Sequence, residues 1–403
     1  MTYDPTDPAR RQPNVSRRAV LGALAGGFVA APAFLRGRFR LFAESRMEYS
    51  ARAIKLVGES LTIDMLNQFR FADFAEKPPL SSRWLAKPGT FTAAQFEAYR
   101  TSGTKVFALG HGASDYEAGV RYFADWNGFM AGYSDWLVRI DDVTDFERVR
   151  APGKVGVMLT FQTSDHFRTP DDVDTFFGLG QRASQLTYNY ANRLGAGFLE
   201  NQDGGLTVFG AQIVARMNQV GMAVDLSHCA DRTTMDGIAA SSKPVVFTHA
   251  SCRALLPDHM RCKTDEAIRA LAKSGGVMGI PYLRFMVRDR EPVTIEHVLD
   301  HFDHVVRLVG VEHAGIGSDM DLIGNPNPVN GAPLTETPNW ARYDLHRDPE
   351  GRITVAGLDH PKRMFDLTDG LIRRRYQDAD IKLILGGNFA RVLGTIWPAP
   401  AAQ

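Results

Sequence analysis

The chain has 403 residues and carries 46 Lys and Arg against 46 Asp and Glu, so its formal net charge at pH 7 is zero. A balanced charge provides no overall field that would favour nucleic acid or an anionic membrane, which excludes a general polyanion binder. An apolar fraction of 44%, with 37 Gly and 21 Pro, is typical of a globular chain with a large core rather than of a disordered one. Three cysteines are too few for a disulfide framework.

The beginning of the chain has the order of a twin-arginine export signal. A polar start is followed by Ser16, Arg17 and Arg18, and then by a Gly- and Ala-rich apolar run over residues 22–35. This run is too short and too weakly apolar for a stable transmembrane anchor. We therefore predict that residues 1–33 are a signal peptide, that the twin-arginine translocase is a partner during export, and that the protein is periplasmic. The alternative is a disordered tail in which two arginines occur by chance.

Eight short apolar runs alternate with amphipathic segments along the rest of the chain. Strands that are apolar along their whole length are typical of parallel strands buried on both faces, and the amphipathic segments have apolar residues at the spacing of helices. This alternation predicts an α/β fold, a single (β/α)₈ TIM-type barrel over residues 34–403, with a long loop at 324–339 over its mouth. The predicted strands are 61–66, 105–109, 154–161, 183–188, 222–228, 244–249, 276–281 and 314–319.

Polar residues end or follow several of these predicted strands. In such barrels the chemistry lies where the strands end and the following loops begin. A catalytic Zn²⁺ is commonly bound by imidazoles and carboxylates, with one coordination position left open for water. Two imidazoles and a carboxylate at one mouth of the barrel would provide such a set of ligands. The alternative is that both histidines are hydrogen-bonded core residues, and the residues alone leave both interpretations open. The polar residues are Gln162, Tyr188, His228, His249 and Asp319.

Five motifs follow one another along the chain and carry a specific resemblance. On these motifs the chain from about residue 57 to 393 resembles the membrane (renal) dipeptidase family, peptidase family M19. Members of that family are zinc enzymes with an amidohydrolase-like barrel, so the resemblance implies the same fold and a metallo-dipeptidase activity. The motifs are DLSH at 225–228, PVVFTHAS at 244–251, Arg261 followed by TDE at 264–266, GIGSDMD at 315–321, and GGNFARVL at 386–393.

The resemblance implies a role for each matching residue. His228 and His249 match the two ligands of the family's more exposed zinc. Arg261 matches the arginine that binds the terminal carboxylate of the substrate, a bidentate task that suits a guanidinium. Asp319 matches the carboxylate that contributes to the more buried zinc and that can handle the proton moved during attack by water.

The chain departs from the family pattern at four positions. Leu66 and Gln68 stand where the first strand of the family has its His and Asp ligands, and Gln162 stands where the family has a Glu that bridges the two metals. Neutral carbonyl oxygens are poor ligands for Zn²⁺, so we predict one zinc ion rather than two, with a metal-free site as the alternative. Tyr188 replaces a family His, and its hydroxyl could donate to a developing oxyanion.

All three cysteines lie beside motif residues, and two interpretations remain open for them. Cys229, Cys252 and Cys262 could supply a thiolate ligand, which Zn²⁺ favours. However, neighbouring residues on a strand face opposite ways, so Cys229 should point away from the mouth if His228 points into it. We interpret all three as small buried residues, and a bridge between Cys252 and Cys262 is a weaker alternative.

Several other polar residues have weaker claims to a role. His111 follows the second predicted strand and could line the pocket, but we interpret it as an exposed loop residue. Asp165 and His166 follow Gln162 and could form an acid/base pair, although most such pairs lie in surface loops. The histidines at 297, 301 and 304 have helical spacing and are interpreted as a solvated helix face.

These observations predict an exported hydrolase that cleaves a dipeptide, or a similar small amide with a free carboxylate. A single metal on His228 and His249 would activate water, while Arg261 would bind the carboxylate and Asp319 would act as base or ligand. Tyr188, Gln162 and Gln68 would contact the substrate. One rival is an inactive barrel that binds a carboxylate ligand, and another is a hydrolase or lyase of changed chemistry. Members of the family are commonly homodimers, so the resemblance also implies a homodimer.

Overall fold

The computed structural model describes residues 38–39, 48–67, 69, 80–150, 153–322 and 354–398. The predicted signal peptide, Gln68 and the predicted loop at 324–339 lie outside these residues. Within the described part, no helix is both long enough and apolar enough to cross a membrane.

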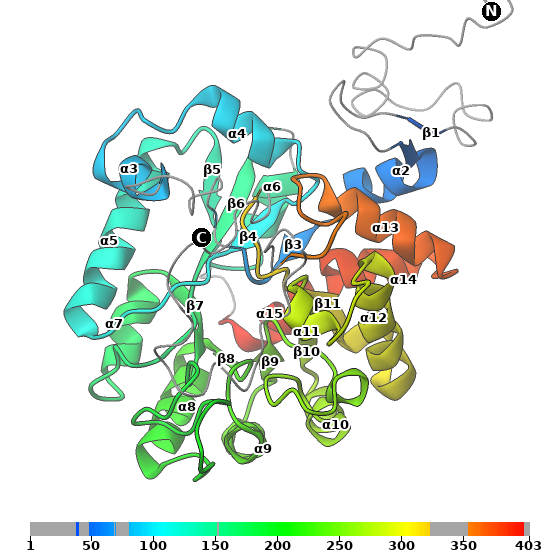
Figure 1. Cartoon of the computed structure of the whole chain (residues 1–403). Coiled ribbons are helices and arrows are strands. Elements are labelled where there is room, and N and C mark those ends of the chain that lie inside the picture. The colour runs from blue at the N-terminus through cyan, green and yellow to red at the C-terminus, as the bar shows by residue number, and fades with distance from the viewer. Residues whose placement is uncertain are drawn as a thin grey trace, which may run out of the picture.

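Parallel strands form a closed barrel at the centre of the molecule (Figure 1). The hydrogen-bonded path of the sheet runs β11-β10-β9-β8-β7-β6-β4-β3, and its two end strands meet where the Met65 amide donates to the Ile316 carbonyl at 2.9 Å. The strands of this sheet are β3 (Ile63–Asp64), β4 (Val106–Ala108), β5 (Leu137–Arg139), β6 (Val155–Phe161), β7 (Gln181–Gln185), β8 (Ala223–Asp225), β9 (Val246–Phe247), β10 (Val277–Ile280) and β11 (Ala314–Ile316).

All eight predicted barrel strands are present, and the predicted (β/α)₈ fold is confirmed. Most strands are shorter than predicted, because the chain leaves the ladder before the polar residues of the motifs. Tyr188, His228, His249 and Asp319 therefore lie in the loops that follow the strands. One strand was missed, since β5 pairs with β6 off the barrel path and has only three residues. A separate antiparallel pair joins β1 (Arg38–Phe39) to β2 (Tyr49–Ser50).

Helices surround the strands (Figure 1). Most carry their apolar residues on the face toward the barrel, as their three- and four-residue spacing predicts. The helices are α2 (Ala51–Glu59), α3 (Leu80–Ala86), α4 (Ala93–Arg100), α5 (Tyr116–Gly132), α6 (Asp145–Arg150), α7 (Asp172–Gly178), α8 (Val208–Val220), α9 (Asp231–Ala240), α10 (Asp265–Lys273), α11 (Arg284–Val287), α12 (Ile295–Val309), α13 (Arg363–Arg373), α14 (Asp378–Lys382) and α15 (Asn388–Ile396), with short helices η4 (Arg253–Leu255), η5 (Val311–His313) and η8 (Leu383–Gly387).

Helix α15 packs against the barrel interior. One core cluster joins Phe389, Val392 and Leu393 of this helix to inward side chains of the strands, such as Val106. A Cβ atom at Gly315 of β11 would lie 2.4 Å from the Phe389 ring, so glycine is required for this close approach. The end of the barrel at which α15 packs is therefore filled with apolar side chains, and the polar residues of the motifs gather at the other end.

The prediction for the α12 histidines was wrong for His301. This side chain is fully buried, its Nδ1 accepts from the Cys252 amide at 3.1 Å, and its Nε2 donates to the Val287 carbonyl at 3.0 Å. His301 lies three residues after the buried Val298 and four before the buried Val305, so it shares their face. The helical spacing could therefore have predicted that His301 is buried with Val298 and Val305.

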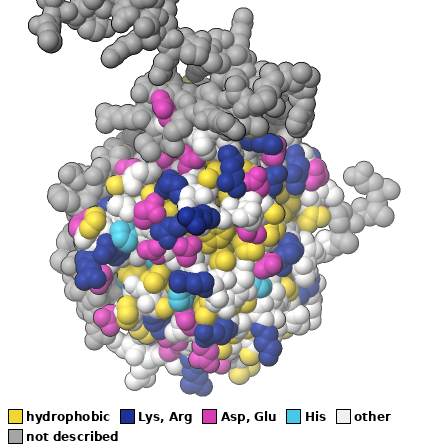
Figure 2. Space-filling view, turned by 90° about the vertical axis from the view of Figure 1, so that its right-hand side faces the viewer, with side chains coloured by type: hydrophobic (Ala, Val, Ile, Leu, Met, Phe, Trp, Pro, Cys, Tyr) yellow, Lys and Arg dark blue, Asp and Glu magenta, His cyan; other side chains and the backbone are white. Residues whose placement is uncertain are grey.

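Both signs of charge are interspersed on the face of the molecule that carries α12 and α13 (Figure 2). On these helices Arg374 forms ion pairs with Glu296, Asp300 and Asp303 at 2.6 to 3.0 Å. Local pairing of this kind intersperses the two signs of charge, so no large patch of one sign forms on this face.

Candidate metal centre and its surroundings

Two loops at the carboxyl ends of neighbouring strands bring His228 and His249 together. His228 follows β8 by three residues, and His249 follows β9 by two. Their Nε2 atoms lie 2.9 Å apart, and both side chains are buried. The prediction that these two imidazoles meet at one mouth of the barrel therefore agrees with the structure.

Each imidazole is held by a partner on its other nitrogen. His228 Nδ1 lies 2.8 Å from Oδ1 of Asn189, and His249 Nδ1 lies 2.9 Å from Oγ1 of Thr248. The His228 ring also stacks on Tyr188, with the ring centroids 4.5 Å apart. Such contacts fix the orientation and tautomer of imidazoles that bind metals.

The hydrogen-bond network determines which nitrogen carries the proton in each ring. Asp225 accepts from the hydroxyls of both Ser227 and Thr248, so the Thr248 hydroxyl proton is not available to His249. His249 Nδ1 must then donate to Thr248, as His228 Nδ1 donates to the Asn189 oxygen. Both Nε2 atoms are left with lone pairs that face each other. Asp225 thus has a structural role, because it orients the hydroxyls of Ser227 and Thr248.

Two facing lone pairs repel each other unless a cation lies between them. Burial and the nearby Arg261 guanidinium hold the pKa values of His228 and His249 well below the usual range of histidine, so a shared proton is disfavoured. A metal ion fits instead, because two ligands at about 2.0–2.1 Å in a tetrahedron are about 3.3 Å apart. The pair needs to open by only a few tenths of an ångström. On ligand chemistry and spacing, these two residues fit one zinc-like ion.

The third protein ligand is less well defined than the two imidazoles. Among the residues that the structure describes, no group of three or more His, Cys, Asp or Glu is arranged to hold a metal ion. Asp319 has a φ of 57°, in the left-handed region that Asp tolerates, and its amide donates to the Leu66 carbonyl at 2.9 Å. Its charge raises the pKa of Arg261, against the larger lowering by burial. Asp319 therefore lies near the guanidinium, and its role as a metal ligand remains a prediction.

Arg261 contacts the two loops that carry the histidine pair. Its guanidinium donates to the backbone carbonyls of Ser227 and His249 at 2.5 and 2.8 Å, and the side chain is 2% exposed. These bonds tie together the two loops that carry the imidazoles. A guanidinium has five N–H groups, so the two bonds leave donors for a ligand carboxylate. Arg261 thus positions the metal centre besides its predicted role in substrate binding.

The position of the family's second, more buried metal does not fit an ion here. Leu66 is buried, and together with Gln162 it packs against Gly110 so closely that a Cβ atom there would lie 2.2 Å from Leu66 and 2.5 Å from Gln162. The nearby carboxylate of Asp64 is engaged by Ser318 and Asn67, and burial raises its pKa. An aliphatic side chain and an amide thus replace two anionic or imidazole ligands, so a dinuclear centre is not supported.

Restoring the bridging carboxylate alone is expected not to restore a second metal. In Gln162→Glu the buried Leu66 still fills the neighbouring space, so the variant should hold no more than one ion per chain. Metal analysis of the purified variant beside the wild type checks this. A second equivalent of zinc in Gln162→Glu would contradict our interpretation of Leu66. Gln185→Glu is a control, because Gln185 is buried on β7 and donates to the Gln162 carbonyl.

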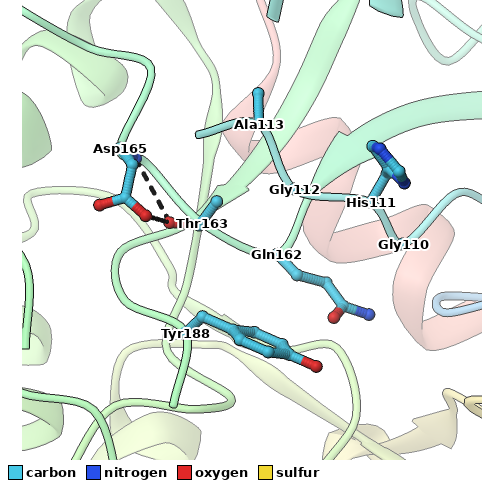
Figure 3. A pocket seen from close by; sticks show the side chains of 8 residues that line it. All are labelled: Gly110, His111, Gly112, Ala113, Gln162, Thr163, Asp165 and Tyr188. Atoms are coloured by element: carbon cyan, nitrogen blue, oxygen red, sulfur yellow. Dashed lines mark hydrogen bonds between the residues drawn. The ribbon is translucent and has the colours of Figure 1, made fainter. Parts of the chain in front are cut away.

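A cavity of about 400 Å³ adjoins the histidine pair on the side of β4, β6 and β7. Tyr188 lines it while stacking on His228, and 45% of the tyrosine is exposed. Figure 3 shows the side chains of Gln162 and Tyr188 extending in the same direction on this cavity. The predicted substrate contacts Tyr188 and Gln162 therefore share one space, whereas Gln68 lies outside the described residues.

The structure separates several residues that the sequence placed side by side. His166 is buried against Phe161, Phe167 and Phe176, whereas Asp165 is exposed at the cavity, so the two do not form an acid/base pair. The cysteines at 229, 252 and 262 are all free and buried, in agreement with the structural interpretation. Burial raises the pKa of each thiol, which disfavours the thiolate.

Sequence reasoning missed the residues that orient the imidazoles. No role was assigned to Asn189 or Thr248 from the sequence, although each contacts an imidazole Nδ1. Polar residues beside a candidate metal ligand are a signal for such partners. The signal was present for Thr248, which immediately precedes His249, but not for Asn189, which lies 39 residues from His228.

The model of the family described as "Membrane dipeptidase (Peptidase family M19)" matches residues 123–332, which is more than half of the chain. The chain belongs to the membrane dipeptidase family. The matched residues include the histidine pair, Arg261 and Asp319. The positions of Leu66 and Gln68 lie before the matched segment.

Similar proteins include both curated relatives and solved structures. Dipeptidase verJ of Clonostachys rogersoniana is 32% identical over 268 residues, which cover 66% of this chain and 61% of that relative. The chain thus spans less than two thirds of its length. An amidohydrolase from Pseudomonas aeruginosa has a TM-score of 0.71 at 26% identity, covering 86% of this chain and 99% of that one.

A metallo peptidase from Rhodobacter sphaeroides, solved with a phosphinate mimic of the dipeptide L-Ala-D-Ala, has a TM-score of 0.66 at 17% identity. The match covers 84% of this chain and 100% of that one. These likenesses confirm the predicted amidohydrolase-like barrel of the membrane dipeptidase family.

Proposed function

We propose that the protein is a metallo-hydrolase that cleaves a dipeptide, or a similar small amide with a free carboxylate, at a single metal ion. The observation that carries this proposal is the pair of Nε2 atoms of His228 and His249, 2.9 Å apart, with both Nδ1 atoms engaged elsewhere. Membership of a dipeptidase family and the dipeptide mimic bound by the Rhodobacter sphaeroides relative support the choice of substrate.

His228 and His249 would hold the ion, with Asp319 or water as further ligands. When bound, a zinc-like ion supplies a Lewis acid that lowers the pKa of water toward neutrality. Arg261 binds the carboxylate of the substrate and fixes its register. Asp319 accepts the proton that leaves the attacking water, then returns it to the departing amine. Tyr188 donates its hydroxyl proton in a hydrogen bond to the carbonyl oxygen as negative charge develops there.

A second candidate is favoured by one observation. Arg261 is 2% exposed and bonded to two carbonyls, an arrangement that is rigid with or without a reaction. A barrel that binds a carboxylate ligand without hydrolysing it would retain the same arginine. The arginine therefore fits either function, and the histidine pair is the feature that favours the hydrolase.

Metal analysis and turnover of the purified protein test the proposal together. We expect about one equivalent of zinc per chain, hydrolysis of members of a dipeptide library, loss of hydrolysis with a chelator, and recovery when zinc is added back. No metal and no turnover on any dipeptide would refute the proposed function and favour the binding protein. Turnover that survives removal of all metal would refute the role of the histidine pair.

We also propose export by the twin-arginine route, supported by Ser16, Arg17, Arg18 and the apolar run that follows them. That route carries folded proteins, so the metal would be installed before export. Replacing both arginines by lysine is expected to retain the protein in the cytoplasm. A homodimer remains a prediction from the family resemblance.

A further inference from the structure

One carboxylate in the lining of the cavity beside the histidine pair has no part in the proposed mechanism. The lining of the cavity consists of Gly110, His111, Gly112, Ala113, Gln162, Thr163, Asp165 and Tyr188. Asp165 is the one carboxylate among these eight residues. It comes from the loop after β6, across the cavity opening from the loop after β4 (Figure 3).

Asp165 is positioned by its neighbour and has an oxygen available for a ligand. Its Oδ2 accepts from the Thr163 hydroxyl, and its amide donates back to the same hydroxyl oxygen at 3.3 Å. No described residue donates to its Oδ1, and the side chain is exposed. A carboxylate accepts about four hydrogen bonds in total, so most of this capacity is open at the cavity.

The site combines cationic side chains at the histidine pair with a carboxylate in the neighbouring cavity, which suits a ligand that carries both charges. Arg261 donates to the carbonyls of Ser227 and His249, and Lys263 donates to the carbonyl of Cys229, so both cations lie beside the loops that carry the histidine pair. Tyr188 stacks on His228 and forms the nearer wall of the cavity. The carboxylate of Asp165 lies beyond this wall. The cationic side chains thus contact the loops of the histidine pair, whereas the carboxylate lines the cavity past Tyr188.

We propose that this cavity is the subsite for the amino-terminal residue of the dipeptide, and that Asp165 binds its free ammonium group. The proposal rests on the proposed function, since it assumes a substrate whose carboxylate lies at Arg261. A dipeptide spans about 7 Å between its ends, so its ammonium must lie on the far side of the scissile bond from the arginine. Asp165 then makes the protein select free dipeptides over N-acylated ones.

The experiment compares two non-hydrolysable ligands by calorimetry on the metal-loaded protein. One is a phosphinate mimic of an Ala-Ala dipeptide with a free amine, and the other is its N-acetyl derivative. We expect the wild type to bind the free amine about two- to fivefold more tightly, as for an exposed ion pair. Asp165→Asn should weaken only the free-amine ligand and bring the two dissociation constants close together. High salt should also reduce the wild-type preference.

A matched control keeps the test specific. Asp171→Asn removes an exposed carboxylate at the start of α7, outside the cavity lining, and should leave the preference unchanged. In Asp165→Asn the amide oxygen still accepts from Thr163, so the loop should keep its conformation. A wild type that binds both ligands equally, or not at all, would overturn the subsite. An Asp165→Asn variant that weakens both ligands alike would do the same.

Failure of the subsite and failure of the proposed function are distinguishable. Hydrolysis of Ala-Ala together with an unchanged ligand preference in Asp165→Asn overturns the subsite and leaves the function standing. A preference that depends on Asp165, without hydrolysis by the zinc-loaded protein, supports the subsite and overturns the function in favour of a binding protein.

Discussion

The His228→Ala variant is expected to lose its metal and at least about a thousandfold of its dipeptide hydrolysis. A bound metal is worth several kcal/mol to the transition state, and about 4 kcal/mol corresponds to a factor of a thousand in rate. With one Nε2 removed, His249 alone cannot retain a zinc-like ion. Metal analysis and steady-state kinetics on Ala-Ala check both expectations, and His249→Ala should behave in the same way.

A control variant separates this effect from general damage. His304→Gln removes an imidazole on α12 that pairs with Asp265 at 2.7 Å, away from the mouth of the barrel. It should retain its metal and stay within about twofold of wild-type turnover, in line with a surface pair that contributes at most about 1 kcal/mol to stability. Circular dichroism should show folded protein in every variant. If His228→Ala kept both metal and turnover, the histidine pair would not be the catalytic centre.

The barrel could be predicted from the sequence because its strands are buried on both faces and read as continuous apolar runs. The run at 154–161 became β6 (Val155–Phe161) almost unchanged. The same logic missed β5, because Leu137–Arg139 is three residues long and ends in an arginine. Short strands off the main path have no hydrophobic pattern long enough to recognise.

The site was predictable at the level of residue types but not of geometry. The spacing of motifs indicated that His228 and His249 share one mouth. It could not indicate that their Nε2 atoms face each other, because both residues lie in loops beyond the strands. That geometry depends on Asn189, Asp225 and Arg261, whose contacts are long-range in sequence. The loss of the second metal position was visible in the sequence, because Leu66 and Gln162 change the ligand chemistry itself.

The free energy of unfolding is expected to fall steeply as the pH drops below 6.5, because histidines are buried in their neutral form. Burial lowers the pKa of His166 to about 3 and those of His259 and His301 to about 4. In the unfolded chain these groups titrate near 6.5. Between the two values only the unfolded state binds the proton, so stability is complete above pH 6.5 and is lost toward the folded pKa.

His166 isolates this effect because its surroundings are simple. The ring is enclosed by three Phe rings, its Nε2 donates to Oε1 of Gln181 at 3.0 Å, and its Nδ1 has no hydrogen-bond partner. Protonation would place an unpaired charge in this apolar cage. From pH 6.5 to about 4, this one group should therefore reduce stability by about 1.4 kcal/mol per pH unit, or about 3 kcal/mol in total.

The variant His166→Leu should remove the contribution of this histidine to the pH dependence of stability. The leucine side chain should still fill the apolar space between the three Phe rings. Urea unfolding of the wild type and the variant at pH 7, 6, 5 and 4.5 measures this contribution, and the two curves should converge or cross as the pH falls. Phe176→Leu is the matched control, because its ring centroid lies 4.4 Å from that of His166. It should cost about 1–2 kcal/mol at every pH through lost packing, and it should leave the wild-type slope unchanged. Equal slopes in the wild type and His166→Leu would mean that His166 takes up its proton in the folded chain as readily as in the unfolded one.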